Sequence, residues 1–460
     1  MRLKILILFR TVKLMRDYKA LFKKRAPAYG YGMGEFGFTF FNFFVAYYLM
    51  YYLTDVLLLP VGVAAILYSV IQWVEGILML AAGIVIDRHS ARGGQYGPWA
   101  FWGSVICAVS TLLFYTNFHA GTTMNVVLFT VFYTLCYVGY NIMWVAYRTL
   151  LDPMSRTPAE TILNSTAASQ MGSLSGVVFS LVGTRLLYGF NTMQSGYTVS
   201  AIVYGCLMIG GMSIVRAFTR KRDVGGVRVE SEAPSVKELL KSINKQFLIL
   251  FFSITFVSAT NTILPTLLVY YFGSVIGDPT WMRSYLLVIT FTSLFGYFIS
   301  PHLSIKYGKK KTFIFSCFTS SIALTMINFI GSIKPLFILM MIIFTFGNLF
   351  SGGMIPVFMN DIAVFNESNY GVRGHAFASS IGGCALRFSQ VIGGALASLG
   401  LVSIGYSAEA EFTLEMGKRI TRLMTFGCVA VLLISAFVFS FYKVEGEALK
   451  DAYFKEKAQQ

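Results

Sequence analysis

Long apolar segments recur twelve times along the 460-residue chain, and they restrict its fold more than any other feature. The first six lie near residues 35–54, 60–86, 99–118, 124–151, 162–187 and 196–218; the second six lie near 247–272, 281–305, 312–330, 336–362, 376–404 and 423–442. About twenty apolar residues span a bilayer as a helix. Because lipid offers the backbone no hydrogen bonds, only helices and closed barrels cross it. Segments of this length match helices, since a transmembrane strand needs only about ten residues. We therefore expect an all-α polytopic membrane protein with twelve transmembrane helices in two six-helix halves.

The composition excludes a soluble protein and argues against a nucleic-acid partner. The chain is 56% hydrophobic and 13% charged, whereas ordinary globular proteins are roughly 25% charged. Its formal net charge of +16 comes from Lys and Arg in tails and short connections, with no basic stripe interleaved with stacking aromatics. The six cysteines lie inside apolar segments without metal-ligand spacing, and the four histidines lie near segment ends. We therefore predict no disulfide, no metal site and no nucleic-acid binding.

The distribution of the 37 Lys and Arg residues also predicts the orientation. Most of them fall in the two tails and in alternate connections, which the positive-inside rule places in the cytoplasm. The protein is thus expected to be integral to the cytoplasmic (plasma or inner) membrane, with both termini cytoplasmic. The predicted parts are a basic N-terminal segment (1–28), a first half (29–218), a linker with an amphipathic helix (219–245), a second half (246–442) and a tail (443–460).

Charged clusters follow corresponding spans in the two halves. Acids there can accept hydrogen bonds from helix N-termini while bases pair across the bundle, which predicts an inner gate. The alternative is ordinary positive-inside charge. The gate residues expected are Asp87, Arg88 and Arg92 after the second span, Asp152 and Arg156 after the fourth, Lys309 and Lys310 after the eighth, and Asp361 and Arg373 after the tenth. Six plus six spans around a polar linker are typical of major facilitator transporters, whose halves enclose a midplane site.

Four short motifs occur in order along the chain. They are Tyr31-Gly-Met-Gly-Glu-Phe-Gly37, Tyr51-Tyr-Leu-Thr-Asp55, Gly94-Gln-Tyr-Gly-Pro-Trp99 and Gly308-Lys-Lys-Lys311. With these motifs the chain resembles the glycoside-pentoside-hexuronide cation symporters, the melibiose permease family. The resemblance runs from about residue 29 to residue 406. It implies a major facilitator fold that works by alternating access and carries sugars or glycosides with sodium, lithium or protons.

The resemblance also directs attention to ionisable groups inside the membrane, which are costly unless they have a partner or water. The family's cation site uses two acids four residues apart in the second helix. Glu75 stands at the position of the first acid, but Met79 stands at that of the second. The family also has an arginine three residues before the first acid, where this chain has Gln72. Arg387 aligns with a helix-eleven lysine that contacts those acids, so we expect it to pair with Glu75. A thioether is a poor sodium ligand, and sodium coupling is therefore disfavoured.

Polar stripes on three spans predict the substrate site. Thr39 and Asn42 share a face of the first span, and in the family the position of Thr39 can hold a sugar-binding aspartate. Helix–helix hydrogen bonding is the alternative role for both. The expected substrate-binding residues are Thr39, Asn42, Gln72, Asn141, Trp144, Arg148 and Gln390. Arg148 can instead pair with an acid or extend to the inner surface, and the family's fifth-span arginine is replaced by Ala167. The aromatic run at residues 36–52 is expected to face lipid or the interface.

These observations predict a secondary transporter of a sugar, glycoside or hexuronide, functional as a monomer in the bilayer. No cofactor is expected. Proton coupling through Glu75 and facilitated uniport both remain open, and the Glu75–Arg387 pair can instead serve only to fix helix packing. A lysophospholipid carrier of the same fold is a further alternative. An enzyme is not expected, because the spans hold no nucleophile with a base and no metal-ligand cluster.

Overall fold

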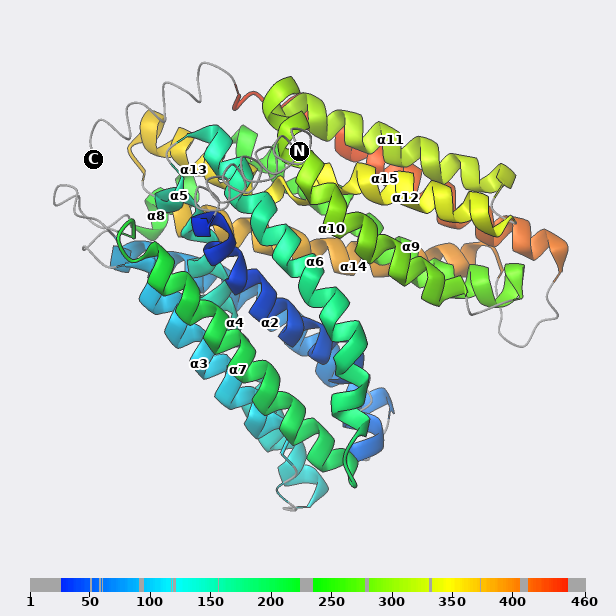
Figure 1. Ribbon diagram of the computed structural model, residues 1–460, viewed down its shortest axis with the longest axis horizontal. Helices are drawn as coiled ribbons and strands as arrows, with labels where there is room; N and C mark the ends of the chain where they lie inside the picture. The colour runs from blue at the N-terminus through cyan, green and yellow to red at the C-terminus, as the bar shows by residue number, and fades with distance from the viewer. Residues whose placement is uncertain are drawn as a thin grey trace, which may run out of the picture.

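The computed structural model describes residues 26–445 except 50–51, 58, 60, 91–94, 117, 119–120, 156, 224–234, 278–280, 331–332, 373 and 406–412. The regular elements in the described residues are helical (Figure 1). The first half comprises a first helix (26–49), α2 (Val61–Ser90), α3 (Tyr96–Phe114), α4 (Thr122–Thr149), α5 (Leu151–Met154), α6 (Pro158–Tyr188) and α7 (Met193–Thr219). After α8 (Val236–Lys241), the second half comprises α9 (Lys245–Tyr270), α10 (Trp281–Tyr307), α11 (Lys309–Ile330), α12 (Lys334–Gly352), α13 (Ile355–Tyr370), α14 (His375–Ser403) and α15 (Leu414–Ser440).

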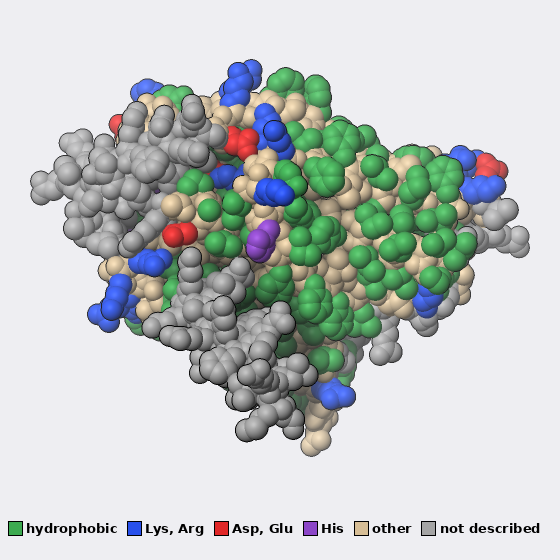
Figure 2. All heavy atoms as spheres, turned by 45° about the horizontal axis from the view of Figure 1, so that its top comes forward, with side chains coloured by type: hydrophobic (Ala, Val, Ile, Leu, Met, Phe, Trp, Pro, Cys, Tyr) green, Lys and Arg blue, Asp and Glu red, His purple; other side chains and the backbone are tan. Residues whose placement is uncertain are grey.

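Ten helical stretches within the described residues are long and apolar enough to cross a membrane. Large hydrophobic side chains stay exposed along these helices, for example Phe295 of α10, Phe315 of α11 and Phe437 of α15. Figure 2 shows broad hydrophobic surface on the face it presents. Exposed apolar area of this extent, along helices long enough to span a bilayer, is typical of a surface that faces lipid. The expected all-α membrane fold is confirmed.

Each half is built around its own hydrophobic core. Buried residues between Tyr31 and Val215 form one cluster, which Ala376 and Cys384 from the second half also join. Buried residues between Phe247 and Val444 form the other, joined by Ile162 and Leu239. Each half thus has a largely separate core, and a few side chains such as Leu80, Phe251 and Leu386 contact both.

The same irregularities occur at corresponding places in the two halves. The first helix is followed by a π-helical turn, η1 (Tyr52–Val56), and α9 is followed by η2 (Tyr271–Ile276). The fourth span breaks into α4 and α5, and the tenth breaks into α12 and α13. The sequence predicted one unbroken apolar segment near 336–362. The break occurs because Gly352, Gly353 and Pro356 interrupt the helical hydrogen bonds.

The two halves meet closely at the end that carries α5, α8 and α13, here called the α8 end. Helix α2 approaches α14 there, and a Cβ atom on Gly83 would overlap the Ser380 side chain. The Ser165 hydroxyl of α6 donates a hydrogen bond to the Gly353 carbonyl at 2.9 Å. Away from this end the pair α3 and α7 diverges from the pair α11 and α15 (Figure 1).

An acid after the last span of each half caps the third helix of that half. Asp223 accepts hydrogen bonds from the backbone N–H groups of Tyr96 and Gly97, at 3.0 and 2.6 Å. Glu445 accepts one from the N–H group of Lys310 at 3.2 Å. Burial raises the pKa of Asp223 above its usual range, although the two N–H donors act to lower it. The equivalent caps tie the end of the last span to the start of the third helix in each half.

The aromatic run of the first helix is mostly core, and the expectation that it faces lipid was wrong. Phe38, Phe40, Phe41 and Phe44 are buried, while Tyr47 is exposed. Phe44 packs against Tyr115, which follows α3 directly, and against Tyr204 of α7, with ring centroids about 5 Å apart. A central helix surrounded by other helices buries its aromatics against them, which periodicity within one segment cannot reveal.

Several predicted segments fall on residues outside the description. They are most of the basic N-terminal segment, the linker between residues 224 and 234, and the tail beyond 445. In the rest of the predicted linker, α8 begins with a capping box in which the Ser235 hydroxyl and the Glu238 carboxylate each accept a hydrogen bond from the other's backbone N–H.

Candidate functional site

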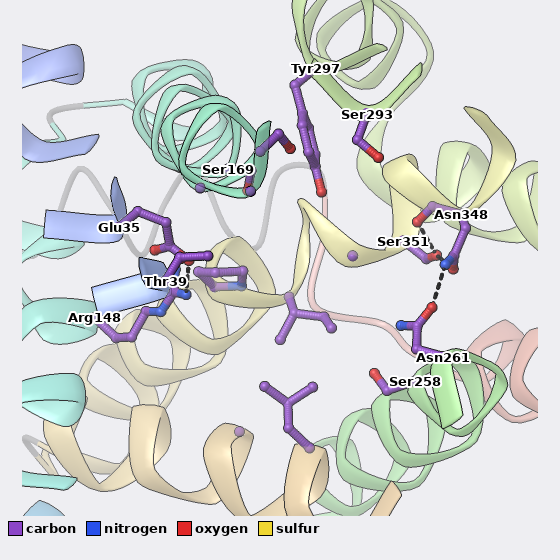
Figure 3. Close-up of a pocket in the computed structure, with 18 of the residues that line it drawn as sticks. Glu35, Thr39, Arg148, Ser169, Ser258, Asn261, Ser293, Tyr297, Asn348 and Ser351 are labelled. Carbon is purple, nitrogen blue, oxygen red and sulfur yellow. Dashed lines mark hydrogen bonds and ion pairs between the residues drawn. The ribbon is translucent and has the colours of Figure 1, made fainter. Parts of the chain in front are cut away.

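A cavity of about 430 Å³ lies between the two halves. The first helix, α4 and α6 line one side of it, and α9, α10, α12, α13 and α14 line the other (Figure 3). Its polar and aromatic lining residues are Glu35, Thr39, Phe43, Trp144, Arg148, Ser169, Ser173, Ser258, Asn261, Thr290, Ser293, Tyr297, Asn348, Ser351 and Ser379. Apolar surface with a few convergent polar groups, at this volume, is typical of a small-molecule site.

An ion pair between Glu35 and Arg148 forms part of the cavity wall. The Arg148 Nη2 atom lies 2.9 Å from the Glu35 Oε1 atom, and the two side chains are 13% and 12% exposed. Glu35 extends from the first helix and Arg148 from α4, so both belong to the first half. The structure thus has Arg148 both lining the cavity and paired with an acid.

Close helix packing brings Glu35 to this position. A Cβ atom on Gly37 would overlap the Leu207 carbonyl of α7, so only glycine allows the first helix to lie this near. On the neighbouring face, Gly172 of α6 lies directly against the Glu35 side chain. The glycines of the motif at residues 31–37 therefore place the carboxylate in the cavity.

Aromatic rings surround the Arg148 guanidinium. Its carbon lies 5.9 Å from the Phe38 ring centroid, 5.2 Å from that of Trp144 and 5.5 Å from that of Tyr147. Cation–π attraction in a poorly hydrated site contributes about 2 kcal/mol. These ring contacts to the cation do not involve its carboxylate partner.

The opposite wall of the cavity carries amides and hydroxyls that the sequence analysis missed. The Asn348 Nδ2 atom of α12 donates to the Asn261 Oδ1 atom of α9 at 2.7 Å, and Ser351 donates to the Asn348 carbonyl at 2.8 Å (Figure 3). Tyr297 of α10 extends into the space between Ser169 and Ser293 (Figure 3). Single polar residues in apolar helices give little signal in one sequence.

A second ion pair, between Glu75 and Arg387, joins the halves outside the cavity lining. Glu75 on α2 is 1% exposed, and Arg387 on α14 is 20% exposed. Arg387 also donates to Gln390 at 3.4 Å and lies 6.0 Å from the Tyr140 ring centroid. The structure brings together the two residues that the sequence analysis expected to pair; their role stays a prediction.

Met79 occupies the position of the family's second acid, one turn from Glu75. It is buried, and a Cβ atom on Gly383 would overlap its sulfur and meet the Trp144 ring. Packing between α2, α14 and α4 thus fills the space where another carboxylate would lie. No cluster of three or more His, Cys, Asp or Glu side chains able to hold a metal ion occurs among the described residues.

The expected substrate residues separate into two groups. Thr39, Trp144 and Arg148 line the cavity. Three others were expected there but lie elsewhere: Asn42 donates to the Tyr140 hydroxyl, buried Asn141 donates to the Glu75 carbonyl, and Gln390 accepts from Arg387. Asn42 and Asn141 thus make hydrogen bonds between helices, and Gln390 makes one within α14. The stripe pattern alone does not distinguish such roles from ligand binding. The Gln72 side chain is not among those that the structure describes.

The expected gate residues join helices in different ways. Asp87 accepts hydrogen bonds from the N–H groups of Ala376 and Phe377 at the start of α14, across the halves. Lys309 and Asp361 form a buried ion pair within the second half, and the Lys310 ammonium donates to the Tyr442 carbonyl. These two lysines therefore tie helices of one half and do not bridge the two halves.

Two further expected gate residues, Asp152 and Arg88, are described. His375 lies 2.7 Å from a Glu367 carboxylate oxygen and 3.9 Å from one of Asp152. Arg88 is exposed. Arg92, Arg156 and Arg373 fall outside the described residues. The cysteines in the described part of the chain are free thiols.

Comparison with known proteins agrees with this architecture. The family model for MFS/sugar transport proteins matches residues 30–446. An uncharacterised symporter, YjmB of Bacillus subtilis, is 27% identical over 90% of this chain and 91% of its own. The isoprimeverose transporter of Lactiplantibacillus pentosus is 25% identical over 91% and 88% of the two chains. A bacterial homologue of the iron transporter ferroportin, solved in an outward-facing state, shares the fold with a TM-score of 0.68 at 14% identity, over 90% of this chain and 98% of that one. The chain therefore belongs to the MFS/sugar transport protein family and is an integral membrane transporter, not an enzyme.

Proposed function

We propose that this protein moves a sugar, a glycoside or a hexuronide across the cytoplasmic membrane by alternating access, with both termini in the cytoplasm. The observation that carries the proposal is the cavity between two separately packed halves, lined by Trp144 and Tyr297 together with amides and hydroxyls. Aromatic faces pack against sugar rings, and amides and hydroxyls bind sugar hydroxyls. The name of the isoprimeverose transporter supports the same substrate class.

The cross-half contacts support the mechanism. Hydrogen bonds from α14 to Asp87 and from Ser165 to the Gly353 carbonyl hold the halves together at the α8 end. Alternating access requires a closed end whose contacts can break when the other end closes. We assign the α8 end to the cytoplasmic side, which makes this an outward-open arrangement of a monomeric carrier.

Coupling is proposed to use the Glu75–Arg387 pair. The pair joins α2 to α14, so relative movement of the halves changes the distance between its charges. Protonation of Glu75 would release Arg387, and this links the proton to the conformational step. Sodium is disfavoured because Met79 fills the space for a second carboxylate.

The alternative lysophospholipid substrate fits this cavity poorly. An acyl chain requires a continuous apolar track, whereas Asn261, Asn348 and Ser351 form a polar wall along α9 and α12. Desolvating those groups against a hydrocarbon chain would cost several kcal/mol.

Uptake into proteoliposomes tests the proposal. Labelled neutral glycosides, hexuronides and a lysolipid are offered with an imposed proton gradient, a sodium gradient or neither, to the wild type and to Glu75→Gln. Proton-driven accumulation of a sugar that Glu75→Gln abolishes is the expected result. Equilibration indifferent to both gradients would make the protein a uniporter, sodium-driven accumulation would contradict the role of Met79, and uptake of the lysolipid alone would overturn the sugar assignment.

A further inference from the structure

We propose that Glu35 and Arg148 form a proton-linked anion site, in which a substrate carboxylate takes Arg148 from Glu35 and Glu35 binds a proton in exchange. The proposal rests on the proposed function, because it concerns the same cavity. It adds a second titrating carboxyl group, distinct from Glu75, and a specific substrate charge.

The pairing leaves hydrogen-bonding capacity unused. One contact, from Nη2 to Oε1 at 2.9 Å, joins the two groups. The Arg148 Nε atom and the Glu35 Oε2 atom have no hydrogen-bond partner within the described residues. A guanidinium has five N–H donors in a planar fork that suits a carboxylate held by two bonds. A substrate carboxylate entering the cavity can therefore bind Arg148 more completely than Glu35 does.

Arg148 can keep its position when its partner changes. The Phe38, Trp144 and Tyr147 rings lie within 6 Å of the guanidinium carbon and do not depend on Glu35. The Tyr147 hydroxyl donates to the Tyr31 carbonyl at 3.1 Å, which fixes that ring. The cation is therefore presented by a rigid aromatic frame, and the carboxylate of Glu35 is the exchangeable member.

Charge balance requires the proton. Glu35 and Arg148 are the charged side chains among the lining residues, and together they are neutral. A bound carboxylate would leave one uncompensated negative charge in a site of low polarity, which is strongly unfavourable. A proton from the aqueous opening, bound to Glu35, restores neutrality. The complex then carries one anion and one proton, with no net charge added to the cavity.

The groups that face Glu35 make it the natural acceptor of that proton. Tyr31 on its own helix, Tyr147 on α4 and Tyr297 on α10 are the titratable neighbours besides Arg148. Phenols stay neutral near pH 7. Helix α6 presents Gly172 and Ser169, which do not titrate in this range. Glu35 is thus the one lining carboxyl group in the described cavity.

The exchange does not require the halves to move. Glu35 and Arg148 both lie in the first half, whereas Glu75 and Arg387 lie in different halves. The Glu35–Arg148 pair therefore responds to substrate binding, and the Glu75–Arg387 pair responds to the relative position of the halves.

Calorimetry on the purified full-length protein in nanodiscs tests the proposal. The probes are methyl β-D-glucuronide and its neutral counterpart methyl β-D-glucoside, titrated in buffers of different ionisation enthalpy so that bound protons are counted. We expect about one proton taken up per glucuronide and none per glucoside. Because a proton enters with the anion, glucuronide affinity should fall by up to about tenfold per pH unit above the titration of Glu35.

Variants assign the proton. Glu35→Gln should still bind glucuronide but take up no proton and lose the pH dependence. Arg148→Gln should lose glucuronide binding, and Glu35→Gln/Arg148→Gln, which leaves no buried charge unpaired, should bind only the glucoside. Asp223→Asn removes a buried carboxylate outside the cavity and serves as the matched control, with proton uptake retained.

Each other outcome overturns the inference in an identifiable way. Proton uptake that persists in Glu35→Gln and disappears in Glu75→Gln would move the site to Glu75. Glucoside binding equal to glucuronide binding, and unchanged in Arg148→Gln, would leave the proposed function intact and remove the anion site. If neither the glucuronide nor the glucoside bound, both the anion site and the proposed function would be contradicted.

Discussion

The Asp87 carboxylate of the first half accepts a hydrogen bond from the backbone N–H of Ala376 in the second half, at 2.9 Å. A second N–H bond, from Phe377 at 2.6 Å, makes this acid the N-terminal cap of α14. A carboxylate at a helix N-terminus gains from both the free N–H donors and the helix dipole. Since the two partners belong to different halves, the cap stabilises one conformation of the transporter as well as one helix.

The first prediction concerns this cap. Asp87→Asn keeps one acceptor oxygen but removes the charge, and we expect it to weaken closure of the α8 end by about 1 kcal/mol. The fraction of molecules open at that end should rise about fivefold. Pulsed electron paramagnetic resonance between spin labels on α2 and α14 near this end should then show a longer distance between the two labels. An unchanged distance distribution would show that the cap stabilises α14 alone.

The Asp223 cap predicts a different effect, on stability alone. Asp223→Ala leaves the N–H groups of Tyr96 and Gly97 without their acceptor, which costs about 1–3 kcal/mol for a buried group. Because burial raises the pKa of Asp223, a neutral acceptor is tolerated, and Asp223→Asn should unfold near the wild-type temperature. Thermal unfolding in detergent compares the two variants. Equal losses in both would mean that the charge itself is required.

The pair between halves predicts non-additive stability. Arg387→Met leaves Glu75, which is 1% exposed, as an uncompensated buried charge, at a cost of about 3–5 kcal/mol. Glu75→Gln/Arg387→Met removes both charges and should recover most of the lost thermal stability. A double variant as unstable as Arg387→Met would indicate that the arginine stabilises the fold through its Tyr140 contact instead.

The sequence predicted the helices well because each span is long and apolar. It also predicted that Glu75 would meet Arg387, since ionisable groups are rare in the spans and a family pattern relates these two positions. It did not predict that Glu35 would pair with Arg148. That contact joins residues 113 apart, and it depends on the close approach of the first helix permitted by glycines such as Gly37.

The polar residues were harder to assign. Asn42, Asn141 and Asn261 have the same side chain inside similar apolar helices, yet only Asn261 lines the cavity. The other two donate hydrogen bonds to neighbouring helices. Which role an amide takes depends on the rotation of its helix against partners distant in sequence, and hydrophobic periodicity does not determine that rotation.

Met79 predicts how this protein responds to sodium. Met79→Asp places a second carboxylate one turn from Glu75 and removes the sulfur that packs on Gly383, so hard oxygen ligands replace a thioether. Ligand binding to the folded state raises the unfolding temperature. We therefore expect sodium chloride, compared with choline chloride, to raise the unfolding temperature of Met79→Asp but not that of the wild type or of Met79→Asn. Sodium stabilisation of the wild type would contradict the expectation that Met79 removes the cation site.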